Sequence, residues 1–538
     1  MSGWADHLVI APIVVPLVAG GLMMLAGEGR RGLNAALGLA STAALVVLAL
    51  ALLRLADAAG QDAAVRVYRL GDWPALFGIV LVLDRLSALM LALTAVLGLA
   101  ALAFSLARWH RAGAHFHPLL QFQLMGLNGA FLTGDLFNLF VFFEVLLAAS
   151  YGLALHGSGT ARVRAGLHYV AINLAASLLF LVAVSVVYGI SGTLNMADLA
   201  RRMAGVAAED RALLEAGLAV LGVAFLVKAA MWPVGFWLPP TYAAASAPAA
   251  AILSILSKVG VYAVLRLWLL LFGGEAGASA GFGGAWLTAG GLLTIAFGTA
   301  AVLAAQNMAR LAGASVLVSS GTLLAAVGAA QVGVTGGALF YLASSVPAIA
   351  AFFLLIELVE RGREVGADVL AVTREAFGGD EHPEDDEEEV GVAIPATMAV
   401  LGLGFMGCGL LLAGLPPLSG FLAKFAMLAP LFGAGGDGVS ATAWALLAAL
   451  ILSGLATVVA MARAGVDAFW ASPAGDAPRV RVVEAAPVAL LLGVCVGLTV
   501  LAGPVMGYME ATARSLHAPQ GYVAGVLPAP DAAAGAGR

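Results

Sequence analysis

The residues best suited to chemistry in this sequence are four ionisable side chains within strongly apolar stretches, namely Glu144, Lys228, Lys258 and Lys424. The chain has only three lysines, and all three belong to this group. A preference for arginine elsewhere can follow from codon composition, but codon composition cannot place every remaining lysine deep inside an apolar stretch. These four residues are therefore our candidate functional residues.

Buried charges are expensive, which limits how these residues can be interpreted. A charged side chain at the centre of a bilayer costs roughly 2.5–3.5 kcal/mol on insertion scales, so three lysines would cost about 8–10 kcal/mol unless they face a hydrated interior. Structural ion pairs are the alternative, but one acid for three bases leaves that interpretation incomplete. We therefore predict a relay for protons or ions. Lysine suits a relay because a desolvated lysine can release its proton, whereas arginine stays charged.

A carboxylate near a buried lysine would control that release. At a separation of about 4 Å and an effective dielectric constant of about 20, a carboxylate favours the charged lysine by about 4 kcal/mol. Making or breaking contact between Glu144 and Lys228 would therefore act as a switch.

Prolines accompany two of the lysines. Pro233 follows Lys228 in "FLVKAAMWPVGFWLPP", and Pro416 and Pro417 precede Lys424 in "GLPPLSGFLAKFAML". A proline inside a helix removes a backbone hydrogen bond, and an unpaired carbonyl at membrane depth is tolerated only inside protein or beside water. A kink accommodated by packing is the alternative at either position. Two interruptions that each lie near a buried lysine favour a hydrated, functional site.

The elements that carry these residues are transmembrane helices. Hydrophobic residues make up 62% of the 538 residues and charged residues only 11%, which excludes a soluble protein. Apolar runs long enough to span a bilayer recur along the chain. We predict about fourteen spans, near 7–26, 33–55, 78–106, 116–133, 135–156, 163–190, 213–237, 243–272, 283–305, 308–330, 335–359, 394–432, 443–464 and 486–508. The span over 394–432 is too long for one straight helix and is expected to be broken.

Arginines in the connections predict the orientation. With both termini outside, the inside connections hold thirteen arginines and the outside connections and tail hold eight, in line with the positive-inside rule. The run "GGDEHPEDDEEEV" (Gly378–Val390) then lies inside and is interpreted as a solvated loop, with cation concentration near a pore as the alternative. The tail "LPAPDAAAGAGR" is of low complexity and is expected to be disordered.

The two interrupted spans would be the seventh and the twelfth, five helices apart. Interrupted spans at corresponding positions in two halves indicate a transporter site at the interface between repeats. Because five is an odd number, the two halves would have inverted topology. This repeat gives the division 1–110 (three helices), 111–272 (first repeat), 283–464 (second repeat, with the acidic inside loop 361–391) and 465–538 (last helix and tail).

Nothing in the sequence predicts a cofactor or a metal centre. The segment "GLGFMG" matches G-x-G-x-x-G, but it lies inside an apolar span and is better explained by helix packing. Cys408 and Cys495 fall inside spans and are interpreted as packing residues. His110, His115 and His117 share one loop, for which a metal site or a proton-collecting surface are alternatives to residues with no special task.

Three segments together resemble a known family. They are "TGDLFNLFVFFEVLLAASYGLALHG" (133–157), the stretch 225–266 that contains Lys228 and Lys258, and "GLPPLSGFLAKFAML" (414–428). They resemble the D-type subunit of Mrp-type multisubunit cation/proton antiporters and, more distantly, the antiporter-like membrane subunits of respiratory complex I. The resemblance covers roughly residues 80–500.

The resemblance implies fourteen helices with two inverted five-helix repeats, whose seventh and twelfth helices are broken. It implies that Glu144 is the fifth-helix glutamate, Lys228 its seventh-helix partner, Lys258 the central eighth-helix lysine and Lys424 the twelfth-helix terminal residue. Family members often carry a histidine early in the eleventh helix, where this chain has Ser344 or Ser345. A serine hydroxyl can pass on a hydrogen bond but cannot hold a proton near neutrality, so water is expected to complete the link.

The resemblance also predicts the function and the partners. We expect a proton-translocating transporter subunit, without enzymatic activity of its own, in a complex of six or seven subunits in a prokaryotic cell membrane. The complex would export Na⁺, or Li⁺ or K⁺, against proton entry. A proton-pumping subunit of a redox-driven complex, related to complex I or to hydrogenases, is the alternative, and a scaffold subunit is a third hypothesis.

Overall fold

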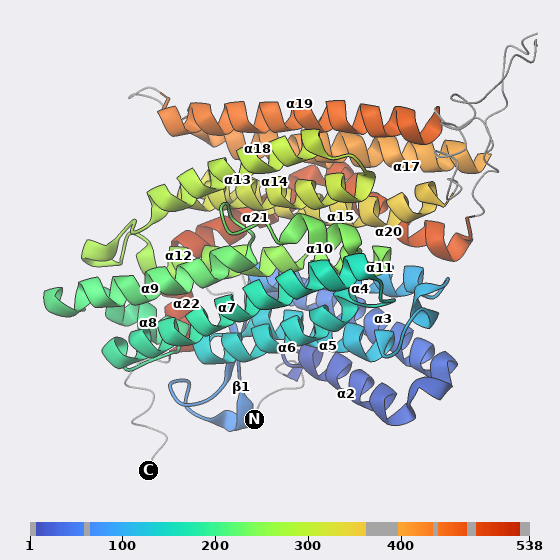
Figure 1. Cartoon of the computed structure of the whole chain (residues 1–538). Helices are drawn as coiled ribbons and strands as arrows, with labels where there is room; N and C mark the ends of the chain where they lie inside the picture. The colour runs from blue at the N-terminus through green and yellow to red at the C-terminus, as the bar shows by residue number, and fades with distance from the viewer. Residues whose placement is uncertain (1–6, 59–64, 362–395, 434–438, 471–479, 528–538) are drawn as a thin grey trace, which may run out of the picture.

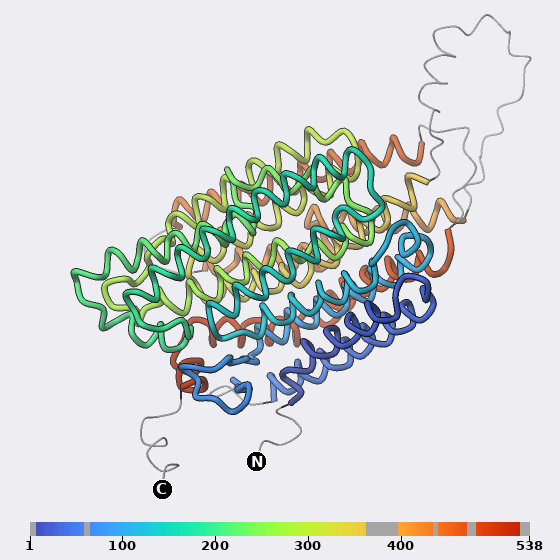
Figure 2. The backbone as a smooth tube through the Cα atoms, turned by 60° about the horizontal axis from the view of Figure 1, so that its bottom comes forward, coloured from blue at the N-terminus to red at the C-terminus, as the bar shows by residue number. Residues whose placement is uncertain are grey.

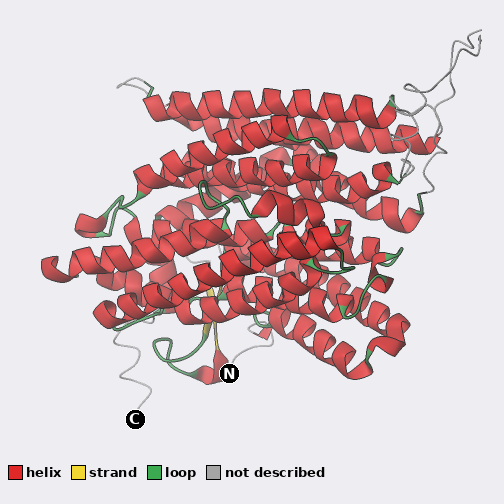
Figure 3. Cartoon of the chain, in the orientation of Figure 1, coloured by secondary structure: helices red, strands yellow, loops and turns green. Residues whose placement is uncertain are grey.

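The computed structural model describes residues 7–58, 65–361, 396–433, 439–470 and 480–527. Within these ranges the chain is almost entirely helical (Figure 3), and eleven helices are long and apolar enough to cross a membrane. Two shorter apolar helices, α2 (Ala11–Ala26) and α18 (Ser419–Gly433), add to these. The prediction of an α-helical polytopic membrane protein is confirmed. The acidic run Gly378–Val390 and the tail from residue 528 lie outside the described residues.

The other helices follow in chain order. They are α3 (Arg31–Asp57), α4 (Arg85–Ser105), α5 (Phe116–Leu132), α6 (Leu136–Ala154), α7 (Thr160–Ser191), α8 (Met196–Met203), α9 (Ala208–Lys228), α10 (Leu238–Ala244), α11 (Ala247–Leu253), α12 (Leu256–Phe272), α13 (Gly284–Ala304), α14 (Met308–Gly328), α15 (Val332–Glu360), α17 (Ala396–Ala413), α19 (Ala441–Phe469), α20 (Val482–Val500), α21 (Ala502–His517) and α22 (Gln520–Val526). Short 3₁₀ turns include η1 (Glu28–Arg30) and η3 (Trp109–Arg111).

One segment that we predicted to be helical is a β-strand. The predicted span over 78–106 begins with β2 (Val80–Leu83), which pairs antiparallel with β1 (Arg66–Arg69), and α4 starts only at Arg85. A short apolar run such as Val80–Leu83 fits a strand or a helix equally well. The boundary is set by Asp84, whose carboxylate accepts a hydrogen bond from the Ser87 backbone N–H at 2.8 Å and so caps α4.

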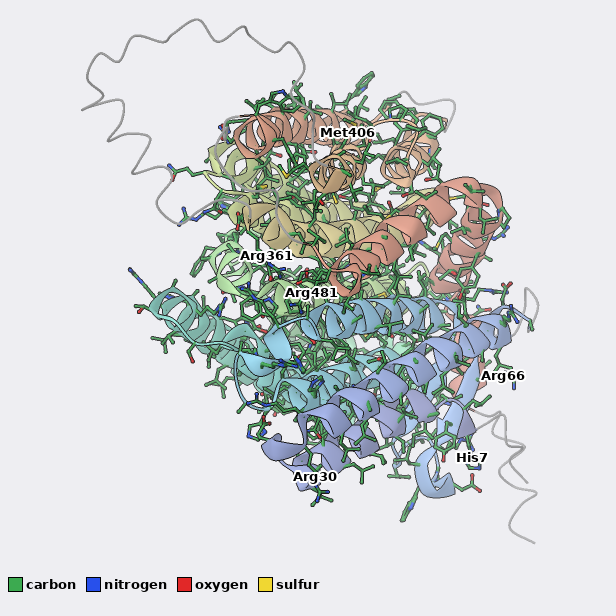
Figure 4. All side chains as sticks on the ribbon, turned by 90° about the vertical axis from the view of Figure 1, so that its right-hand side faces the viewer. His7, Arg30, Arg66, Arg361, Met406 and Arg481 are labelled. Carbon is green, nitrogen blue, oxygen red and sulfur yellow. The ribbon has the colours of Figure 1, made fainter. Side chains whose placement is uncertain are left out.

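The helices run roughly parallel to one another and give the molecule two ends (Figures 1 and 2). We call one the hairpin end, where β1 and β2 lie and where α22 packs against β1. The other is the far end, which holds η1 and η3. There Arg361 and the start of α20 meet, because Arg361 Nη1 lies 2.6 Å from Glu484 Oε1. Figure 4 looks onto the far end and shows Arg361 and Arg481 near its centre, with Arg30 at its lower edge.

The core of the molecule lies along α12, α14 and α15. Nearly every residue of these three helices is buried, whereas α13, α17 and α20 each expose a broad apolar face. In Figure 1, α17 and α19 lie at one edge of the bundle and α2 at the opposite edge. Two of the candidate lysines are carried by α9 and α12, and the third by α18. The candidate residues therefore cross the buried middle of the bundle.

Candidate functional site

The first helix interruption separates α9 from α10, and Pro233 lies in the connecting segment, as predicted. The segment folds tightly against the end of α9. Ala230 has a φ of 58°, which is uncommon outside glycine, and a Cβ on Gly235 would lie 2.1 Å from the carbonyl oxygen of Ala230. Lys228 is the last residue of α9, so its side chain sits where the helix stops.

Glu144 and Lys228 are joined through a serine. Ser177 of α7 donates a short hydrogen bond to Glu144 Oε1, and Lys228 Nζ donates to Ser177 Oγ at 3.4 Å. Lys228 Nζ also lies 5.1 Å from the centre of the Phe143 ring, within cation–π range. We predicted direct contact between acid and base, and the structure instead places a hydroxyl between them. A single serine in an apolar span gives no sequence signal, so Ser177 was missed.

Helix α12 packs directly on the end of α9. A Cβ on Gly260 would lie 2.5 Å from the Ala229 nitrogen and 2.7 Å from the Phe225 oxygen, so only glycine permits this approach. The close packing brings the helix that carries Lys258 against the backbone that carries Lys228.

Lys258 is completely buried in the first turn of α12. Its Nζ donates to Ser320 Oγ at 3.0 Å and approaches the Val316 carbonyl oxygen at 3.5 Å, both on α14. The span predicted over 243–272 is itself interrupted between α11 and α12, just before Lys258. No proline marks this point, so the interruption was not predicted.

Serine side chains continue from α14 through α15 to α18. Ser319 and Ser345 hydroxyls lie 3.1 Å apart, and those of Ser344 and Ser419 lie 2.7 Å apart. A cavity of about 10 Å³, which is room for roughly one water molecule, lies between these helices. Its polar lining residues are Ser315, Ser319, Tyr341, Ser344, Ser345 and Thr457. The structure thus places Ser344 and Ser345 beside a water-sized space.

The second interruption separates α17 from α18, with Pro416 and Pro417 between them. Lys424 reaches back across it and donates from Nζ to the Ala413 carbonyl oxygen at 2.8 Å. Ala413 lies four residues before Pro417, and a proline cannot donate the helical hydrogen bond that this carbonyl would otherwise accept. Gly414 has a φ of 74°, and a Cβ there would lie 2.7 Å from the Lys424 side chain. The lysine therefore occupies the gap that the broken helix leaves.

The three lysines are all at least 92% buried, with exposed fractions of 5%, 0% and 8% for Lys228, Lys258 and Lys424. Of the three, Lys228 alone has a carboxylate nearby within the described ranges. Among the described residues, no Asp or Glu forms an ion pair with Lys258 or Lys424, and the buried ion pair between Asp84 and Arg266 lies apart from them. The arrangement provides ionisable groups with hydroxyls beside Lys228 and Lys258, and two further pairs of serine hydroxyls join α14 to α15 and α15 to α18.

The other candidate residues do not form a second catalytic group. In the described part of the chain, no three His, Cys, Asp or Glu side chains come together as a metal site. His110 Nδ1 and His117 Nε2 lie 3.4 Å apart, whereas His115 pairs with Glu28. His117 is only 5% exposed, so its side chain lies inside the protein. Cys408 and Cys495 are buried free thiols.

The fold and the buried lysines beside two interrupted helices define an antiporter-like membrane subunit. Residues 133–455 match the family described as NADH:quinone oxidoreductase/Mrp antiporter, transmembrane, and the chain belongs to this family.

Curated relatives refine this assignment. The chain is 60% identical to a protein of Rhizobium meliloti named as the D-type subunit of a probable K⁺/H⁺ antiporter, over 99% of both chains. It is 32% identical to the D-type subunit of a Na⁺/H⁺ antiporter of Alkalihalophilus pseudofirmus, over 97% of this chain and 99% of that one. These relatives confirm the resemblance to D-type Mrp subunits.

Solved structures share the fold. A chain of the Mrp complex from Dietzia sp. superposes with a TM-score of 0.81 at 24% identity, covering 97% of this chain and 99% of that one. A chain of respiratory complex I from Thermus thermophilus with bound NADH superposes with a TM-score of 0.73 at 23% identity, covering 97% and 100%. At these identities the likeness concerns the fold alone.

Proposed function

We propose that the chain is the proton-translocating D-type subunit of a multisubunit monovalent cation/proton antiporter in a prokaryotic cell membrane. The other subunits of the complex, six or seven in all by family resemblance, are its partners. The names of its relatives support antiport and include both K⁺ and Na⁺. K⁺ is the cation to test first, because the relative at 60% identity carries that name. Na⁺ and Li⁺ follow.

The observation that carries this proposal is a row of ionisable groups, of which the three lysines are buried and Glu144 is partly buried. It begins at Glu144, passes through Lys228 and Lys258, and ends at Lys424. Ser177 connects the first pair, and the serines of α14, α15 and α18 lie between Lys258 and Lys424. Groups of this kind at membrane depth belong to proton pathways far more often than to packing.

In the first half, the contact through Ser177 sets the charge of Lys228. When Ser177 bridges Glu144 and Lys228, the carboxylate stabilises the protonated lysine. When the bridge opens, Lys228 loses that stabilisation and its proton is free to move. Helix α12 packs on the end of α9 at Gly260. A positive charge on Lys228 therefore disfavours a positive charge on Lys258 of the adjoining helix.

In the second half, hydroxyls and water carry the proton. A serine hydroxyl donates and accepts hydrogen bonds at the same time, so a chain of serines can pass a proton without holding it. The serines Ser344 and Ser345 beside the water-sized cavity provide this link between Lys258 and Lys424. The Ala413 carbonyl then holds the protonated ammonium of Lys424 at the helix interruption.

The membrane architecture that we propose has fourteen crossings. Inverted five-helix repeats occupy 111–272 and 283–464, with three preceding helices over 1–110 and a last helix and tail over 465–538. Both termini lie outside, so the far end faces the cytoplasm. The interruptions at Pro233 and at Pro416 and Pro417 are the corresponding hinges of the two repeats.

Exchange by the whole complex in everted vesicles tests the proposal. Lys258→Met keeps the bulk of the side chain and removes its charge, and Leu267→Met on the same helix is the control. We expect K⁺- or Na⁺-dependent proton movement to disappear in Lys258→Met and to remain in Leu267→Met, with equal assembly. Normal exchange in an assembled Lys258→Met complex would show that the lysine row does not carry protons.

A further inference from the structure

The buried side of α3 changes character halfway along the helix. Its first half, toward the far end, presents polar or small residues, and its second half presents apolar ones. The residues in order are Asn34, Gly38, Ser41 and Thr42, then Leu45, Ala49, Leu52 and Ala56. Ser41 lies ten residues beyond Arg31, or about 15 Å at 1.5 Å per residue, which is half of a hydrocarbon core of about 30 Å.

Helix α5 supplies polar residues opposite this half of α3. His117 and Gln121 lie one helical turn apart, and both are buried. Ser41 Oγ donates to Gln121 Oε1 at 2.7 Å. At the mouth, His117 Nε2 lies 3.4 Å from His110 Nδ1. We call the group formed by His117, Gln121, Asn34, Gly38 and Ser41 the α3–α5 inlet.

Three polar atoms in the inlet are buried without a protein partner among the described residues. They are His117 Nδ1, Gln121 Nε2 and Asn34 Oδ1. Buried polar groups of native proteins almost always bond protein or ordered water. Gly38 faces the first of these atoms, because a Cβ at that position would lie 3.4 Å from His117 Nδ1 and 3.3 Å from Leu102. A side chain at position 38 would fill the space in front of the imidazole.

We propose that the α3–α5 inlet is a hydrated passage that opens at the far end, conducts protons to the middle of the membrane and ends at Leu45. One water molecule can donate to an imidazole nitrogen and accept from the Gln121 amide, so it satisfies both atoms. This passage lies in the three helices before the first proposed repeat and in α5, apart from the row of Glu144 and the lysines.

The chemistry of the lining favours protons over metal cations. Among the described residues, two of the three unpartnered atoms of the inlet are nitrogens, Gln121 Nε2 and His117 Nδ1, and an amide N–H donates hydrogen bonds, so it repels a cation but binds water. The ionisable groups around the mouth are Glu28, Arg31, His110, Arg111, His115 and His156. Burial and then Arg111 and Arg31 hold the pKa of His110 below its usual value. Arg111 Nε also donates a hydrogen bond to His110 Nε2 at 3.2 Å, and His110 Nδ1 faces His117 Nε2, so His110 joins the mouth to the inlet.

Cysteine accessibility tests whether the passage holds water. Ser41→Cys places a thiol inside the inlet, and Leu45→Cys places one a turn further along the same buried stripe. The two native cysteines are buried and give the background. Whole complexes in right-side-out and everted vesicles are treated with the small cationic reagent aminoethyl methanethiosulfonate, then denatured, and the remaining thiols are counted with a maleimide mass tag.

We expect the Ser41→Cys thiol to react at least about tenfold faster than the Leu45→Cys thiol, and only from the side that the far end faces, because the charged reagent and the thiolate both require water. If the α3–α5 inlet holds no water, both thiols will be equally unreactive, and that result would overturn the proposal. Reaction from the hairpin side would overturn the proposed direction of opening. Labelling needs no transport, so its outcome is independent of whether the lysine row is the relay.

Filling the inlet tests whether it conducts protons. Gly38→Val places methyl groups before His117 Nδ1, and Ala49→Val fills a position in the apolar half of the same stripe. Gln121→Leu is a second variant, which removes the amide without adding bulk at Gly38. We expect Gly38→Val and Gln121→Leu to reduce maximal exchange to less than half, with Ala49→Val unchanged at equal assembly. Full exchange in both inlet variants would show that the passage carries no protons.

Discussion

The two helix interruptions hold their lysines in different ways. At the first, Lys228 ends α9 and faces Glu144 across the Ser177 hydroxyl. At the second, Lys424 crosses the gap between α17 and α18 and bonds the Ala413 carbonyl. A carboxylate can change the charge of a lysine, whereas a carbonyl can only hold a charged ammonium in place. The first interruption is therefore suited to switching and the second to transfer.

The difference also bears on why Lys258 and Lys424 lack a carboxylate partner among the described residues. Among the described residues, Lys258 bonds the Ser320 hydroxyl and the Val316 carbonyl, and Lys424 bonds the Ala413 carbonyl. Without a fixed counter-charge, each of these lysines is stable in its neutral form between transfers. In the proposed relay, a proton on Lys258 would therefore meet no fixed negative charge among the described residues that could hold it there.

Removing the switch should have the largest effect. Lys228→Ala takes away the proton-accepting group and leaves Glu144 with no basic partner, so we expect exchange to be abolished while the complex still assembles. Glu144→Gln should behave alike, because Lys228 then loses the one acid that lies near it in the described part of the chain. The measurement is cation-dependent proton movement in everted vesicles, normalised to co-purified subunits. An assembled Lys228→Ala complex with near-normal exchange would show that the first interruption is not a switch.

Removing only the bridge should have an intermediate effect. Ser177→Ala deletes the hydroxyl between acid and base, and a hydrogen bond contributes about 0.5–1.5 kcal/mol, so we expect a loss of about two- to thirteenfold. Ser177→Thr keeps the hydroxyl and should restore most of the activity. Ser185→Ala, on an exposed position of the same helix, is the control. If Ser177→Ala and Ser185→Ala have equal activity, the Glu144 carboxylate influences the charge of Lys228 without the Ser177 hydroxyl.

The smallest effect is expected from the acidic loop. Neutral replacements of Glu384, Asp385, Asp386, Glu387, Glu388 and Glu389 should leave maximal exchange nearly intact, because charges in a solvated loop are screened within about 8 Å at physiological salt. Exchange at saturating cation is the quantity to measure. Loss of most activity there would show that the switch and the transfer site are not sufficient to describe transport.

The sequence predicted those parts of the site whose residues are energetically costly where they stand. A lysine in an apolar span and a proline in a helix are both expensive, so Lys228, Lys258, Lys424 and the two interruptions stood out. Ser177 and Gly260 did not, because serine and glycine are common in membrane helices and only the packing of α7, α9 and α12 gives them their roles. The interruption before Lys258 was missed for the same reason, since no proline marks it.

Boundaries depended on residues that fit more than one structure. Val80–Leu83 could continue a helix, and Asp84 decides against it by capping α4 at its own position. Asp135 does the same for α6, where its carboxylate accepts a hydrogen bond from the Asn138 backbone N–H at 2.8 Å. Sequence periodicity cannot distinguish such a cap from an ordinary polar residue at the end of a span.

The exchange activity of two Lys424 variants as a function of pH, at matched assembly, tests most directly whether the second interruption transfers protons. Lys424→Arg keeps a fixed positive charge that arginine does not release, whereas Lys424→Glu introduces a different group that can titrate when buried. We predict that Lys424→Glu keeps partial exchange with a shifted pH optimum and that Lys424→Arg is much less active. Full activity in Lys424→Arg with none in Lys424→Glu would contradict proton transfer at Lys424, because the site would then need only a permanent charge.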